Sequence, residues 1–209
     1  EIDALAQMLI QEEKAIPAFR GYRGYPANIC TSINEEIVHG IPSERRLKEG
    51  DIISLDTGIN YAGYFSDAAI TVPVGRVNRQ AKKLIDVTKN SLAEGIKQAC
   101  SGNHLSDISS AIQNYVERHG FSVVREFVGH GIGTCLHEEP EIPNFGLPHQ
   151  GPLIKSGMVL AIEPMVNAGT WKSKVLENQW TAVTADGKFS AHFEHTVAVT
   201  DNGPEILTR

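Results

Sequence analysis

The spacing of hydrophobic and polar residues predicts three amphipathic helices, over residues 1–15, 78–100 and 105–120. The first of these begins without a capping residue. For the third, we expect Ser106 to cap the start and Gly120 to end the helix.

Runs of apolar residues bounded by Gly, Pro and Asn predict six strands, over residues 51–60, 64–72, 122–129, 158–166, 179–185 and 193–200. Helices interspersed with these strands indicate mixed α+β architecture in a single domain, residues 1–209.

Two stretches of the chain resemble each other. "KEGDIISLD", residues 48–56, matches "KSGMVLAIE", residues 155–163, in its Lys, its Gly, its apolar run and its final acid. A second acid-bearing strand follows each stretch. We therefore expect two related halves, about 1–100 and 101–209, whose acid-bearing hairpins meet at the midline. Common turn chemistry and a chance match explain the similarity equally simply.

Two aspartates, Asp56 and Asp67, interrupt strands that otherwise look buried. A turn centred on Tyr61 and Ala62 would place them directly opposite each other on one face of a hairpin. Their charges would repel, so a cation between them is one explanation. A turn-capping aspartate beside an exposed one explains this hairpin equally well.

The second half of the chain supplies more residues of the same kind. Glu163 and Glu194 lie in apolar strands, and His130 is flanked by glycines that allow close approach of a ligand. Four carboxylates and one imidazole would balance the charge of two divalent cations. Mn, Fe, Co and Zn all suit such ligands, and the sequence does not choose among them.

Composition narrows the function classes. The chain has a net charge of −6, 41% hydrophobic and 21% charged residues, which is ordinary for a globular protein and does not favour nucleic acid as the main ligand. Its longest apolar run, "MVLAIEPMV", is too short for a membrane span. Three separated cysteines favour a reducing compartment, so we expect a cytoplasmic protein.

Several longer motifs together resemble the type I methionine aminopeptidases of the M24 metallopeptidase family. They are "GYPANICTSINEEIVHGIP", "GDIISLDTGI", "FSDAA", "GHGIGTCLHEEP", "IEPMVN" and "FEHTVAVTDNGPEIL". The resemblance covers essentially the whole chain. It implies a pita-bread fold, in which two pseudo-symmetric halves surround a curved, mainly antiparallel sheet. It also implies removal of the initiator methionine from nascent chains with a small second residue.

The same resemblance implies a role for each site residue. It makes Asp56, Asp67, His130, Glu163 and Glu194 the ligands of two divalent metal ions, with attack by a metal-bound water on the scissile carbonyl. Glu163 would also accept a proton, His137 would stabilise the oxyanion, and His39 would contact the scissile nitrogen. Substrate-binding residues would be Tyr22, Tyr25, Cys30, His39, His137 and Trp180.

Three expectations qualify this picture. Phe19 and Leu136 differ from the residues usual at their positions, so we expect them to change the shape of the methionine pocket but not the reaction. A helical segment that usually precedes this point in the family is expected to be absent. We also expect a monomer with transient ribosome contact, implied by the resemblance, and no membrane partner.

Two alternatives remain at this stage. X-Pro aminopeptidases and prolidases use the same metal ligands, but they usually carry an additional N-terminal domain for which this chain has no room. A non-catalytic binding module of the same fold is the other alternative, although such modules usually lose metal ligands and this sequence keeps all five.

Overall fold

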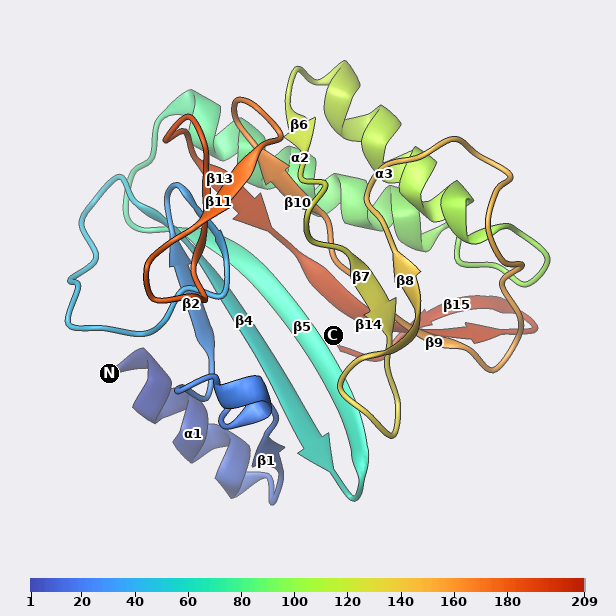
Figure 1. Cartoon of the computed structure of the whole chain (residues 1–209), viewed down its shortest axis with the longest axis horizontal. Coiled ribbons are helices and arrows are strands. Elements are labelled where there is room, and N and C mark those ends of the chain that lie inside the picture. Colours follow the sequence, from blue (N-terminus) through green and yellow to red (C-terminus); the bar gives the residue numbers. More distant parts are fainter. Residues whose placement is uncertain (209) are drawn as a thin grey trace.

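The computed structural model describes residues 1–208, most of whose strands join one antiparallel sheet (Figure 1). Its strand order is β1 (Ile16–Pro17), β4 (Ile52–Tyr61), β5 (Tyr64–Pro73), β14 (Glu194–Thr200), β9 (Val159–Ile162), β7 (Gly129–Gly131) and β8 (Glu138–Ile142), with β2 (Cys30–Ile33) beside β4 and β15 (Gly203–Ile206) beside β14. Two small sheets contain β13 (Ser190–His192), β10 (Met165–Asn167) and β6 (Ser122–Val123), and β11 (Ser173–Val175), β12 (Ala182–Thr184) and β3 (Glu36–Val38).

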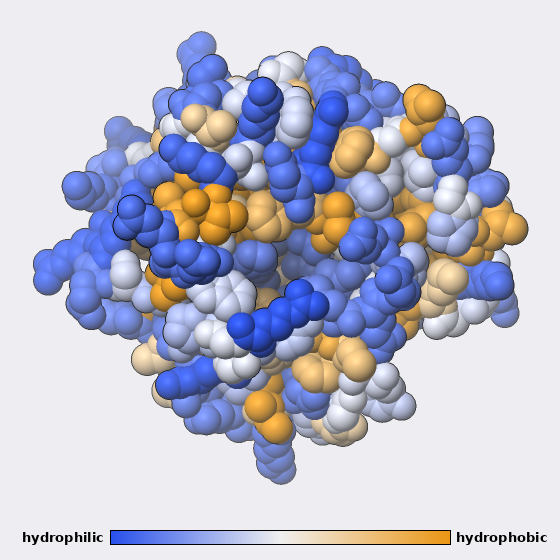
Figure 2. Space-filling model, viewed as in Figure 1, coloured by the Kyte–Doolittle hydropathy of each residue, from blue (hydrophilic) through white to orange (hydrophobic). Residues whose placement is uncertain are grey.

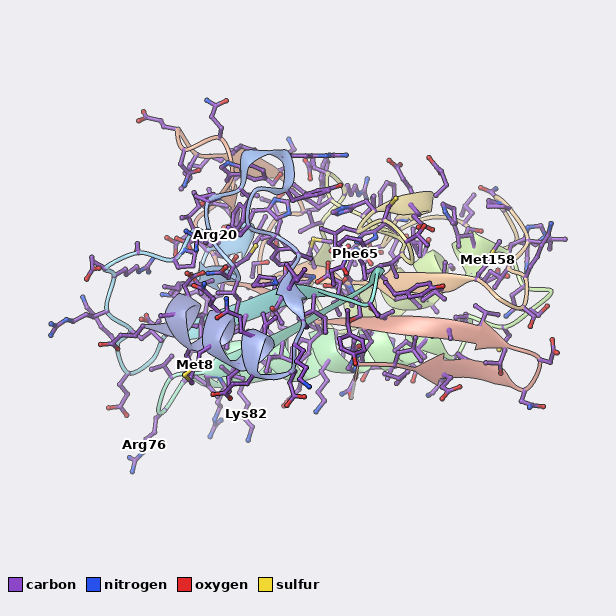
Figure 3. All side chains as sticks on the ribbon, turned by 90° about the horizontal axis from the view of Figure 1, so that it is seen from below. Met8, Arg20, Phe65, Arg76, Lys82 and Met158 are labelled. Carbon is purple, nitrogen blue, oxygen red and sulfur yellow. The ribbon has the colours of Figure 1, made fainter. Side chains whose placement is uncertain are left out.

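Two long helices, α2 (Arg79–Ile96) and α3 (Leu105–Arg118), cover one face of the large sheet (Figures 1 and 3). The residues between the helices and the sheet are fully buried and apolar, among them Leu84, Ile108, Ile112, Leu160, Ile162 and Val197. Each such side chain stabilises the fold by about 1.5–3 kcal/mol. This core packs against one face of the sheet, so the opposite face remains available for a functional site.

A shorter helix, α1 (Ile2–Glu12), lies beside β1 at the edge of the molecule (Figure 1). It begins without a side-chain cap, as predicted, and none of its residues is buried. Leu5, Met8 and Leu9 are each about half exposed. Within residues 1–208, no helix has the length and apolar character needed to cross a membrane.

The three predicted helices are present, but the cap predicted for α3 is wrong. His104 is its N-cap residue, and the backbone N–H of His104 donates to the carboxylate of Asp107 at 2.8 Å. Ser106 lies in the first turn, where its hydroxyl accepts a hydrogen bond from the backbone of Gln150. Gly120 has a left-handed φ of 84°, as expected just beyond a helix end.

Two predicted strands are interrupted. Residues 122–129 contain only the two residues of β6 and the start of β7, with a bend between them. Residues 158–166 divide into β9 and β10, because Pro164 cannot donate a backbone hydrogen bond and the chain changes sheet there.

The β4–β5 hairpin turns one residue later than predicted. Tyr61 pairs with Tyr64, and the two residues between them, Ala62 and Gly63, both have positive φ, as a type I′ turn requires. Asp56 therefore pairs with Ala69, and Asp67 pairs with Gly58. The aspartates still share one face, because the register differs by two residues, but they are diagonal neighbours and not directly opposite.

The acid-bearing strands lie side by side at the centre of the large sheet. In the order β4-β5-β14-β9, the pair from the first half of the chain adjoins the pair from the second half. This is the arrangement that a repeated half would give. The repeat itself, with halves of about 1–100 and 101–209, stays a prediction.

Candidate metal centre and substrate pocket

The predicted ligands come from five consecutive strands of the large sheet. Asp56 lies in β4, Asp67 in β5 and His130 in β7, whereas Glu194 begins β14 and Glu163 directly follows β9. Because β9 and β14 pair with His195 opposite Ile162, the two glutamates stand beside each other at the strand ends. All five residues line one cavity on the face of the sheet opposite α2 and α3.

Burial makes this cluster of carboxylates costly. Asp56, Asp67 and Glu194 are less than 9% exposed, and Oδ1 of Asp56 and Oε1 of Glu194 have no hydrogen-bond partner within residues 1–208. Burial, followed by the charges of neighbouring carboxylates, raises the pKa of Asp56, Glu163 and Glu194 well above their usual range. Burial likewise raises the pKa of Asp67 to about 7. The cluster therefore needs protons or cations to balance its charge.

The histidine of the cluster has a ring oriented for metal binding. Nδ1 of His130 lies 2.8 Å from the carbonyl oxygen of Gly131, so that nitrogen carries the proton and Nε2 presents its lone pair. That Nε2 lies 3.6 Å from Oε1 of Glu163. Burial lowers the pKa of His130, which keeps the ring neutral near pH 7. A neutral imidazole is the form that binds a metal ion.

Ligand atoms gather in two groups that share Glu194. Asp67, His130 and Glu194 offer one atom each within 4.8 Å of one another, and so do Glu163, His192 and Glu194. Unpartnered carboxylate oxygens and a correctly oriented imidazole are what a divalent transition-metal site requires. The residues therefore fit a divalent metal centre.

An apolar pocket adjoins this centre, in a cavity of about 270 Å³. Its wall contains Phe19, Tyr22, Tyr25, Cys30, Leu136 and Trp180, which include every residue predicted to hold the methionine side chain. The Tyr25 and Trp180 rings meet edge to face at 5.0 Å. Figure 2 shows a hollow near the middle of this face, with hydrophobic side chains at its border. Aromatic rings and a thiol suit a polarisable thioether.

The pocket also contains the two histidines predicted to act on the scissile bond. Nδ1 of His137 lies 2.9 Å from the Tyr22 hydroxyl, and the His137 ring lies 4.2 Å from that of His130. Burial, followed by nearby positive groups, lowers the pKa of His137 to about 4. Burial lowers the pKa of His39 as well. Both rings are therefore neutral near pH 7.

Sequence reasoning missed His192, which contacts one of the predicted ligands. Its side chain is 2% exposed, and its Nε2 lies 3.4 Å from Oε2 of Glu163. Burial lowers the pKa of His192 to about 3. In the sequence it resembles any inward-facing residue of a short strand, so its contact with Glu163 becomes visible only once β9 and β13 are placed.

Unpaired buried carboxylate oxygens beside a neutral imidazole suit a divalent metal ion, and residues 1–201 match the model of metallopeptidase family M24. The chain belongs to this family. Within it, the chain is 56% identical to methionine aminopeptidase 1 of Bacillus subtilis, a match that covers 100% of this chain and 84% of the relative. The methionine aminopeptidase of Clostridium acetobutylicum matches with the same identity and coverage.

Solved structures agree with these sequence matches. The methionine aminopeptidase of Thermotoga maritima superposes with a TM-score of 0.98 at 48% identity, covering 100% of this chain and 84% of that one. The prolidase of Pyrococcus horikoshii superposes with a TM-score of 0.78 at 23% identity, covering 53% of its own length, and this likeness concerns the fold alone. The fold is thus the pita-bread fold, as predicted.

Proposed function

We propose that this protein removes the N-terminal methionine from nascent proteins and peptides, with preference for a small second residue. The observation that carries the proposal is the meeting of the five side chains predicted to bind metal with an aromatic, thiol-containing pocket in one cavity. The relatives named methionine aminopeptidases support the same conclusion. An X-Pro peptidase is not favoured, because the likeness to prolidases is confined to the fold.

Asp56, Asp67, His130, Glu163 and Glu194 would hold two divalent cations, of Co, Mn, Fe or Zn. Cations bound there would polarise the scissile carbonyl and lower the pKa of the attacking water. The four carboxylates then become ionised, which matches their negative charge to that of two dications and removes the cost of burying them.

Three side chains of the cavity would move or stabilise charge during hydrolysis. Glu163 would accept the proton that the attacking water loses. With Nδ1 accepting from the Tyr22 hydroxyl 2.9 Å away, His137 would carry its proton on Nε2 and donate it to the developing oxyanion. His39, whose ring packs edge to face against Phe127 and Trp180, would contact the scissile nitrogen and assist departure of the new amine.

The pocket wall would select methionine as the N-terminal side chain of the substrate. Tyr22, Tyr25, Cys30 and Trp180 surround a slot that suits an unbranched thioether. Phe19 and Leu136, the two positions at which the sequence departs from the family pattern, are both buried in this wall. They would adjust the shape of the slot and leave the reacting groups unchanged.

The protein would act as a cytoplasmic monomer that meets its substrates as they leave the ribosome.

The test of the proposed function is release of free methionine from Met-X peptides by metal-stripped protein resupplied with Mn, Fe, Co or Zn. Metal-dependent release favouring small X supports the proposal. Preferential cleavage of X-Pro peptides, or no cleavage by folded protein with any metal, would refute it.

A further inference from the structure

The carboxylate of Glu163 faces two different histidines. Its Oε1 lies 3.6 Å from Nε2 of His130, and its Oε2 lies 3.4 Å from Nε2 of His192. One histidine comes from β7 and the other from β13, so they approach the carboxylate from separate sheets. Only His130 has a role in the proposed reaction, which leaves Oε2 and His192 to be explained.

The backbone of His192 is held firmly in place. Its N–H donates to Oγ1 of Thr71 at 2.8 Å, and the hydroxyl of Thr71 donates to its carbonyl oxygen at 2.8 Å. On the other side, His192 pairs with Met165 of β10. These contacts fix the backbone position from which the imidazole ring projects, and thereby limit which partners the ring can reach.

The ring of His192 is buried without any hydrogen bond. Neither Nδ1 nor Nε2 has a partner within residues 1–208, although the ring is 2% exposed. Burying a polar group without a hydrogen bond is costly, so a ring in this position needs a partner. A neutral imidazole carries one N–H, and Oε2 of Glu163 is an acceptor within a short movement of it.

We propose that His192 is a positioning residue, which donates its Nε2–H to Oε2 of Glu163 and thereby holds Oε1 toward His130 and the metal centre. N–H···O⁻ bonds measure about 2.7–2.9 Å, so the contact would shorten by roughly half an ångström when the carboxylate is ionised. Hydrogen bonds of this kind orient metal-binding carboxylates, and their loss typically costs about 10–100-fold in metal affinity. The inference rests on the proposed metal centre.

Two substitutions at His192 distinguish a positioning role from a role as a metal ligand and from no role in metal binding. His192→Gln keeps an N–H donor but provides a much poorer metal ligand than imidazole, and His192→Leu keeps bulk without any donor. His119→Gln, at the half-buried end of α3 and remote from the cavity, is the matched control. Titration of each metal-stripped variant with Co²⁺ would give the dissociation constant by calorimetry and the ligand field by visible absorption.

We expect His192→Leu to weaken Co²⁺ binding by about 10–100-fold. We expect His192→Gln and the His119→Gln control to stay close to the unsubstituted protein in affinity and spectrum. Equal losses in the Gln and Leu variants would overturn the proposal, because they would make His192 a metal ligand. Unchanged binding in His192→Leu would overturn it as well. No peptide is present, so failure of the proposed methionine release would be seen separately.

Discussion

The two acid-bearing strand pairs hold their carboxylates in different ways. In β4 and β5, Asp56 and Asp67 lie within continuous strands joined by a two-residue turn. In β9 and β14, Glu163 directly follows one strand and Glu194 begins the other. Within residues 1–208, both histidine nitrogens that approach a carboxylate of this cluster within 4 Å approach Glu163. The first pair is thus a rigid source of oxygen ligands, and the second places a carboxylate where it can also exchange a proton.

The variant with the largest expected loss of activity should distinguish a carboxylate that only binds metal from one that also exchanges a proton. We expect Glu163→Gln to reduce methionine release by about 10³-fold even at saturating metal, because the variant loses a metal ligand and the proton acceptor together. We expect Asp56→Asn to recover much of its activity as metal concentration rises, since it loses a ligand alone. The measurement is kcat for a Met-Ala peptide across a metal titration. Normal activity of Glu163→Gln would refute the assignment of Glu163 as metal ligand and proton acceptor.

A smaller loss is expected from a residue outside the ligand set. His39→Ala should lower kcat by about 10²-fold, the usual cost of removing one group that stabilises charge in the transition state. Metal content should stay the same, because His39 is not among the five residues proposed to hold the cations. Elemental analysis of the purified variant checks this, and loss of metal would instead make His39 a structural part of the centre.

The hydroxyl of Tyr22 offers a finer test. Tyr22→Phe keeps the aromatic wall but removes the hydroxyl that lies 2.9 Å from Nδ1 of His137, so the imidazole loses the partner that would orient it. We expect kcat to fall by about 10-fold while KM for Met-Ala changes little. A change confined to KM would show that Tyr22 acts only through the methionine pocket.

The smallest effect concerns pH. The pKa of Asp67 is raised by burial from its ordinary 3.8 to about 7, so this group favours the metal-free fold at low pH. That stability is lost as pH rises from about 4 through about 7, where the unfolded chain ionises and the folded one does not. Metal removes this cost, so the increase in Tm on adding metal should be greater at pH 8 than at pH 5.5. Equal increases in thermal scans would contradict this account.

Local signals in the sequence were sufficient for the helices and for the strands that carry the acids. The spacing of apolar and polar residues along each helix or strand depends only on which of its faces is buried. The hairpin register was wrong by two residues because the turn was placed on Tyr61 and Ala62, although Gly63 is the residue best able to adopt positive φ. A turn centred on Ala62 and Gly63 gives the observed register.

Other features depend on contacts between distant parts of the chain. The bend after β6 follows from Val124, whose N–H donates to the carbonyl oxygen of Met165, and from Arg125, whose guanidinium stacks on Phe145 and Trp171. No local pattern specifies such partners. The same holds for His192, which gains significance only from the proximity of Glu163.

The sharing of ligands between strands has a consequence for the lifetime of the folded state. Asp56 and Glu194 belong to opposite halves of the sequence, and no short segment contains the whole ligand set. Loaded with cations, the centre would act as a removable cross-link that closes very long loops of chain. Unfolding would then have to wait for metal to dissociate, so a chelator should set how quickly the protein unravels as well as whether it does.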